Sequence, residues 1–481
     1  MKYYKIFLVA LMLAAGTPAC KNDFLDVVDN GELSRQSYVK DLNSMESFMN
    51  GIYVSLNRYF VHGIGAAYPE LVADNLKPLT LPPQSLWQHY NWSQQKDEVG
   101  GYSPIETALN MNASWQGGYY IIRACNFVIE EVDKYRNENQ VKADNIKGQA
   151  YAIRALVHFN LVNIFAQAYA FSAGASHPGI PYITTSDISE PYSRQTVAEV
   201  YNGMIADLGN AVKLLPANAS DVRFMSRNAA NALLARTHLF KADYPAAKTL
   251  AQEICNQVPL LAIADGYPNA LFNNKAPAET EVLFQATPGD NYSSRFLGTY
   301  LRGGLLRFNA TNDVAMILQE NLNDIRSNWV TNESGEWNVT KFPVSATGEP
   351  PLRSIPEADY YQPIIRSSEI FLTAAEACAQ TGDENNARTY LDAVRRRADP
   401  SIGSSTATGA ALLEAIYKER RKELSFEGLR MYDLQRWKKE VRRMDALSGA
   451  PAVLAYPSNK AIAPIPLQDI KLAGISQNID Y

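Results

Sequence analysis

The residues best suited to chemistry lie in one stretch near the C-terminus, ERRKELSFEGLRMYDLQRW, from Glu419 to Trp437. It combines carboxylates and arginines at short spacing. Such a set has two interpretations. Two carboxylates would act as a general acid and a base across a glycosidic bond, or the carboxylates and arginines would form ion pairs that hold helices together.

The spacing favours the ion pairs. Glu419, Glu423 and Glu427 are four residues apart, so on one continuous helix they share a face. Glycoside hydrolysis needs two carboxyl groups that face each other, ~5 Å or ~6.5–9.5 Å apart, and neighbours on one helix face point the same way. Arginine partners also lower a carboxyl pKa, whereas a general acid needs a raised one. We therefore predict a structural clamp, with Gly428 ending the helix.

The histidines and cysteines give no other catalytic pattern. The histidines are His62, His89, His158, His177 and His238. No HxxxH, GxSxG or glycine-rich phosphate motif is present. The cysteines beyond the N-terminal region, Cys125, Cys255 and Cys378, are odd in number and far apart, which predicts buried free thiols. We expect no catalytic residue, no metal and no cofactor.

Aromatic side chains indicate recognition instead. The chain has 27 Tyr and 6 Trp against 17 Phe, and aromatics with a polar group suit surfaces that meet a hydrogen-bonding ligand. The segment ELVADNLKPLTLPPQSLWQHYNWSQQ is the best candidate, because a sugar site needs a flat aromatic platform beside amide or carboxylate groups. The candidate ligand-binding residues are Asp74, Trp87, Asn91 and Trp92, with Tyr292, Trp329 and Trp337 from a second region. The alternative is that these aromatics pack on the scaffold.

Helices must position these residues. Beyond residue 104 apolar residues recur at helical spacing, and residues 152–164 are apolar on both faces, which predicts a buried helix. Residues 231–255 and 370–398 each form a helix, a short turn and a second helix. About 34 residues per pair is typical of tetratricopeptide repeats. Two looser pairs, built on 145–169 with 196–215 and on 115–135 with its neighbours, predict a right-handed superhelix of four pairs.

Two regions lack this periodicity, residues 60–104 and about 257–365. Long loops in a compact domain are often functional, and disordered segments are poor in aromatics. We therefore predict ordered, ligand-facing loops inserted in one predominantly all-α domain, residues 20–481. The net charge of -5 does not favour nucleic-acid binding.

The N-terminus has the pattern of a lipoprotein signal, residues 1–19. Lys2 and Lys5 precede an apolar run over 6–15, which is too short to span a bilayer, and TPAC ends at Cys20. Lipidation of Cys20 would anchor the chain. An ordinary secretory signal followed by a chance cysteine is the alternative.

Several motifs together resemble those of the SusD/RagB family of outer-membrane lipoproteins of Bacteroidetes. They are CKNDFLDV, SWQGGYYIIRACNFVIEEVD, IKGQAYAIRALVHFNLVNIFAQAY, RSSEIFLTAAEACAQTGD, IYKERRKELSFEGLRMYDLQRW and APIPLQDIKLAGISQNIDY. The C-terminal signature matches almost position for position. The closing motif departs from the family pattern, with Asp469 for Glu and Ile479-Asp480 for Pro-Gly.

The resemblance implies an α-helical fold of four tetratricopeptide-like units with a loop-rich variable face, and no catalysis. It implies a SusC-like TonB-dependent transporter as partner and mostly glycan, sometimes peptide, ligands at the cell surface. Family glycan sites draw an acidic residue, a Trp and an Asn from this part of the chain, which Asp74, Trp87 and Asn91 match by type. The alternatives are a peptide-binding SusD/RagB-type or tetratricopeptide scaffold protein, and a helical-toroid glycoside hydrolase.

Overall fold

The computed structural model describes residues 38–61, 64–78, 86–94, 111–217, 221–272, 281–285, 308–342 and 363–481. The predicted signal segment, Cys20, His62 and Tyr292 lie outside these residues. Across the described ranges, no helix has the length and apolarity needed to cross a membrane.

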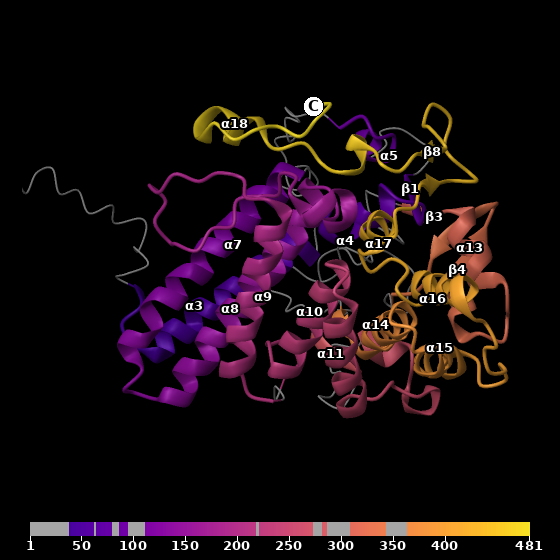
Figure 1. Ribbon diagram of the computed structural model, residues 1–481, viewed down its shortest axis with the longest axis horizontal. Coiled ribbons are helices and arrows are strands. Elements are labelled where there is room, and N and C mark those ends of the chain that lie inside the picture. Colours follow the sequence, from indigo (N-terminus) through magenta and orange to yellow (C-terminus); the bar gives the residue numbers. More distant parts are fainter. Residues whose placement is uncertain are drawn as a thin grey trace, which may run out of the picture.

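Eight of the longer helices lie in a row that follows the chain (Figure 1). They are α3 (Leu42–Leu56), α7 (Met111–Glu131), α8 (Gln140–Phe165), α9 (Val197–Leu214), α10 (Arg227–Phe240), α11 (Tyr244–Gln257), α14 (Ser367–Gln380) and α15 (Glu384–Ala398). Helix α3 packs on α7, α8 on α9, α10 on α11 and α14 on α15, so the four predicted helix pairs are confirmed. The right-handed sense of the superhelix stays a prediction.

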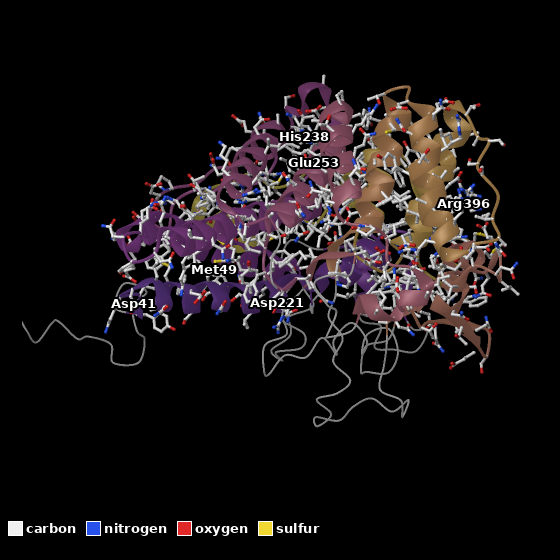
Figure 2. The ribbon with its side chains drawn as sticks, turned by 90° about the horizontal axis from the view of Figure 1, so that it is seen from below. Asp41, Met49, Asp221, His238, Glu253 and Arg396 are labelled. Atoms are coloured by element: carbon white, nitrogen blue, oxygen red, sulfur yellow. The ribbon has the colours of Figure 1, made fainter. Side chains whose placement is uncertain are left out.

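Seen from below, the row runs from the N-terminal helices to α15 (Figure 2). Asp41 and Met49 mark one end, Arg396 marks the other, and His238 and Glu253 lie between them. Each pair also contacts the next, because α7 packs on α8, α9 on α10 and α11 on α14. The pairs therefore bury one another's apolar faces, as stacked repeats do.

The turns inside the two clearest pairs have matching caps. Asp243 caps α11 by accepting a hydrogen bond from the backbone N–H of Ala246, and Asp383 caps α15 through that of Asn386. Such caps satisfy backbone donors that a helix start leaves unpaired. Asp383 also pairs with Lys248 of α11, with 2.6 Å between Nζ and Oδ2. The same aspartate thus starts one helix and links it to the preceding pair.

Helix α8 is buried on both faces, as its apolar pattern predicts. Its buried polar residues include Arg154, whose Nε donates to Asp207 Oδ2 of α9 at 2.7 Å. Close approach depends on Gly148, where an added Cβ would lie 2.8 Å from Leu215 Cγ and 3.1 Å from Leu214 Cβ. The polar pair and the small residue fix how α8 and α9 meet.

A second core lies beside the helical row, in the regions predicted to be loops. It is built on a sheet with strand order β1-β3-β5-β4, made of β1 (Leu76–Pro78), β3 (Phe308–Ala310), β5 (Glu336–Val339) and β4 (Val330–Glu333). Strands β2 (Val282–Gln285) and β6 (Pro363–Arg366) form a separate antiparallel pair. Short helices α4 (Ile64–Leu71), α5 (Trp87–Tyr90) and α13 (Asn312–Gln319) adjoin these strands. The loop prediction is therefore wrong for the described parts of these regions that form this core.

The C-terminal part returns across the molecule. It contains α16 (Gly409–Glu423), α17 (Arg430–Arg436), the β7–β8 hairpin (Val441–Arg442 with Val453–Leu454) and α18 (Leu467–Ala473). The Nδ2 of Asn478 donates to the carbonyl oxygens of Phe165 and Ala463, both at 2.8 Å. The last residues therefore lie against the end of α8, above the helical row in Figure 1.

Candidate functional site

The charged stretch 419–437 forms the buried clamp that its spacing indicates. Glu423 is fully buried, and its Oε2 accepts hydrogen bonds from Arg326 Nη1 at 2.8 Å and Tyr267 Oη at 3.1 Å. Its Oε1 accepts from Arg397 Nη2 at 2.6 Å and from Arg366. Burial raises the Glu423 pKa, but the three arginines outweigh it and hold the pKa well below its ordinary range. A carboxyl in this state cannot serve as a general acid at neutral pH.

One detail of that prediction is wrong. Helix α16 ends at Glu423, so Glu427 lies in the following turn and does not continue the helical face. The backbone reverses at Phe426 and Gly428, which have φ of 67° and 84°. Glu427 turns instead toward Arg366 and Lys341, with 2.7 Å between Arg366 Nη2 and its Oε1. The position of Glu427 therefore follows from its ion pairs with Arg366 and Lys341 and not from a helical spacing shared with Glu419 and Glu423.

Two of the described histidines have structural partners. His158 is fully buried, its Nδ1 is 2.9 Å from the Arg154 carbonyl oxygen, and burial lowers its pKa to about 3. His238 lies 3.0 Å from Asp243 at the start of α11. Over the described ranges, no three His, Cys, Asp or Glu side chains gather as they would around a metal ion. The cysteines at 125, 255 and 378 are free thiols, and Cys255 is only half-buried.

Three of the predicted ligand-binding side chains lie in the interior. Asp74 follows α4 and its carboxylate accepts from Arg430 Nε at 2.7 Å and Nη2 at 2.9 Å. Trp92 donates from Nε1 to the Val72 carbonyl oxygen at 2.8 Å. Trp329 is 2% exposed, with Lys341 Nζ 4.0 Å from its ring centroid. These side chains make intramolecular contacts and leave little surface for a ligand.

The remaining described candidates are half-buried. Trp87 begins α5, and its ring centroid lies 5.8 Å from that of Tyr90. Asn91 is the C-cap of α5, and its backbone N–H donates to the Trp87 carbonyl oxygen at 2.9 Å. Trp337 lies on β5 opposite Ala310 of β3. Both Trp87 and Trp337 pack against the second core, so the structure brings two predicted regions to one part of the molecule.

A group of polar side chains beside this core was missed in the sequence. Lys77 Nζ lies 2.8 Å from Glu336 Oε2 and 2.9 Å from Asp445 Oδ2. Asn309 Nδ2 donates to Glu336 Oε2 at 3.1 Å, and Lys77 is paired with Asn309 across β1 and β3. The one sequence feature that could have indicated this group is Lys77, a charged residue in the short strand β1. Its partners are up to 368 positions away, so spacing does not reveal them.

The structure also has a cavity of about 550 Å³ that none of these aromatics lines, between α15, α16, the segment 320–326 after α13 and the loop 402–407. Its charged side chains pair with neighbours. For example, Lys422 Nζ lies 2.8 Å from Glu320 Oε1, and Arg326 Nη2 lies 2.7 Å from Glu419 Oε1. The cavity contains none of the predicted ligand-binding residues.

Two family models match the N-terminal and C-terminal parts of the chain, and a curated relative matches most of its length. A family model described as starch-binding associating with outer membrane matches residues 23–239, and one described as the SusD family matches 298–478. A curated relative, SusD-like protein P2 of Formosa agariphila, is 26% identical over 493 residues and covers 91% of each chain.

Solved structures share the fold. A putative sugar binding protein from Bacteroides vulgatus has a TM-score of 0.79 and 28% identity, covering 92% of this chain and 99% of its own. A SusD superfamily protein from Bacteroides thetaiotaomicron has a TM-score of 0.78 and 24% identity, covering 91% and 100%.

Proposed function

The chain belongs to the SusD/RagB family, and we propose that it is a surface lipoprotein that binds a glycan or oligosaccharide. In this proposal it delivers the ligand to a SusC-like TonB-dependent transporter in the outer membrane. The proposal includes no catalytic step, because arginines hold the pKa of Glu423, the fully buried carboxyl of the clamp, well below its ordinary range.

The observation that carries the proposal is the position of Trp87. Its ring leans on Tyr90 and the second core while part of it stays exposed. A fixed, flat ring of this kind suits the apolar C–H face of a sugar. Asn91 lies one helical turn further along. Its Oδ1 already accepts hydrogen bonds from the backbone N–H and the hydroxyl of Ser93, so its Nδ2 is the group proposed to donate to a sugar hydroxyl.

The other predicted residues take two roles in the proposal. Asp74, Trp92 and Trp329 take a structural role, since they are buried and contact Arg430, the Val72 carbonyl oxygen and Lys341 respectively. Trp337, which is half-buried on β5, is the second platform. Tyr292 stays a prediction outside the described residues.

Relatives support a sugar as the ligand. The family model over residues 23–239 is described as starch-binding, and the solved relative at 28% identity is described as a putative sugar binding protein. Both fit a site of aromatic rings and neutral polar groups.

A glycan array followed by calorimetry tests this function. We expect the purified protein to bind at least one neutral oligosaccharide with a Kd between about micromolar and millimolar, the range in which a carrier can release its cargo. Peptide libraries provide the comparison. Binding of peptides alone would favour the scaffold alternative, and cleavage of an oligosaccharide would favour the hydrolase.

Lipidation of Cys20 is tested separately. Two or three acyl chains anchor a protein stably, because each buried CH₂ contributes about 0.8 kcal/mol. We expect Cys20→Ala to remove palmitate labelling and to release a folded protein from the membrane fraction. Labelling that persists in the variant would contradict the lipoprotein assignment.

A further inference from the structure

Arg443 has an unusual set of partners for a buried arginine. It is 2% exposed and follows β7, where its backbone N–H donates to the Ala452 carbonyl oxygen at 2.8 Å. The clamp arginines pair with carboxylates. The Arg443 side chain instead donates hydrogen bonds to four backbone carbonyl oxygens.

Those carbonyls belong to the two segments that carry the candidate site. Nε donates to Ala73 at 2.7 Å, and Nη2 donates to Leu71 at 2.9 Å and Val72 at 3.1 Å. Nη1 donates to Tyr90 at 2.6 Å. Carbonyls at the end of a helix lack intrahelical partners, so the guanidinium caps α4 and holds the last residue of α5 at the same time.

The guanidinium also lies over two aromatic rings of the same region. Its Cζ is 3.9 Å from the ring centroid of Tyr90 and 4.1 Å from that of Trp92. A cation over an aromatic face is attracted by the ring quadrupole, and more strongly so when buried. Burial lowers the pKa of Arg443 to about 10, so the group keeps its charge at neutral pH.

These contacts fix the orientation of α5. The helix has only four residues, Trp87–Tyr90, which is too short to be stable alone. Its position therefore depends on what holds its ends. At one end Leu86 has a left-handed backbone with φ of 58°, and at the other end Arg443 holds the Tyr90 carbonyl.

We propose that Arg443 is a positioning residue for the glycan platform. It sets the angle of α5, and thereby of the Trp87 ring, without contacting the ligand. This inference rests on the proposed function for its ligand, but its structural half is measurable without one. The planar guanidinium of arginine can donate to four carbonyl oxygens on two segments, whereas the compact ammonium group of lysine lacks this geometry.

The experiment compares Arg443→Ala and Arg443→Lys with Arg442→Ala in the purified protein. Arg442 is the matched control, because it is the neighbouring residue, its side chain is 65% exposed and it pairs with Glu440. Two readouts are taken. One is hydrogen exchange of the amides in 86–94, with α10 and α11 as internal reference, and the other is the Kd for maltoheptaose and for laminarin by calorimetry.

We expect both Arg443 variants to speed exchange in 86–94 about tenfold or more and to weaken glycan binding about tenfold. Exchange in α10 and α11 stays unchanged, and Arg442→Ala matches the wild type. Millimolar methylguanidinium should restore slow exchange and affinity in Arg443→Ala, because it refills the vacated carbonyl site. Methylammonium, which lacks the planar fork, should not.

Wild-type exchange in 86–94 of Arg443→Ala would overturn the inference. Faster exchange throughout the protein without rescue would overturn it as well, because it would mean a general structural role. If the wild type binds neither glycan while the exchange results hold, the proposed function fails for these sugars and the control of α5 by Arg443 stands.

Discussion

At the scale of single residues, the clamp is a set of ion pairs buried in the protein interior. Glu423 contacts three arginines from distant parts of the chain. Burying such a set gains little net stability, but removing one member leaves the others uncompensated in the interior. Its charged residues are therefore sensitive to substitution for a structural reason, although their types also suit catalysis.

Glu423→Gln tests this interpretation. We expect it to lower the free energy of unfolding by about 3–5 kcal/mol, the usual loss when a buried pair is broken. Glycan affinity should stay unchanged in the folded fraction. Glu414→Gln is the control, since Glu414 forms an exposed pair with Lys439 and should cost less than about 1 kcal/mol. Lost binding at an unchanged melting temperature would show that Glu423 belongs to a ligand site.

Asp74 gives a prediction about pH. Burial alone would raise its pKa, but the opposite effect of Arg421 and Arg430 is larger. The net result is a pKa of about 2, lowered from the ordinary value of 3.8. Because the folded pKa lies below the unfolded one, the contribution is complete above about pH 4 and is lost as the pH falls from 3.8 toward 2. Each pKa unit is worth about 1.4 kcal/mol, so the contribution is about 2 kcal/mol.

Denaturant unfolding between pH 5 and pH 2 measures this contribution. The wild type should lose about 2 kcal/mol more than Asp74→Asn over that range, since the variant has no carboxyl to protonate. If the free energy of unfolding falls with pH equally in the two proteins, the ion pairs with Arg421 and Arg430 are not the main role of Asp74.

At the scale of elements, helix pairs depend on small residues at their contacts. Gly148 of α8 has no room for a Cβ beside the end of α9, whereas Gly51 of α3 has nothing within 4 Å. Gly148→Ala should destabilise the protein by about 1–3 kcal/mol through overpacking. Gly51→Ala should stabilise it by about 0.5–1 kcal/mol, because alanine restricts the unfolded chain. Thermal unfolding of both variants checks the pair, and a stabilising Gly148→Ala would contradict the close contact.

Periodicity predicted the helix pairs because each helix shows its buried face within a few turns of its own sequence. The second core could not be found in that way. Its strands are three or four residues long, too short for an alternating pattern, and β1 pairs with β3 across more than 200 positions. Residue type alone also could not separate Asp74 from a ligand-binding aspartate, since its arginine partners come from α16 and the start of α17.

At the scale of the whole molecule, the helical row and the second core have different roles in this account. The row is a scaffold whose pairs stack in order, and the core brings residues from 67 to 450 together beside it. Trp87 packs on that core, where α5 contacts the segment that contains Arg443 and Gly449. The proposed glycan site would thus be built by contacts between distant segments and would lie outside the repeats.

The central claim is that Trp87 is a glycan platform, and calorimetry of Trp87→Ala tests it most directly. Losing an aromatic contact costs about 0.5–1.5 kcal/mol beyond the area it buries, so the Kd should rise about threefold to tenfold or more. The helical circular dichroism signal and melting temperature should stay close to those of the wild type. Tyr120→Ala, which removes an aromatic that is 54% exposed on α7, should leave the Kd unchanged. A lower melting temperature with unchanged affinity in Trp87→Ala would contradict the claim and make Trp87 a packing residue.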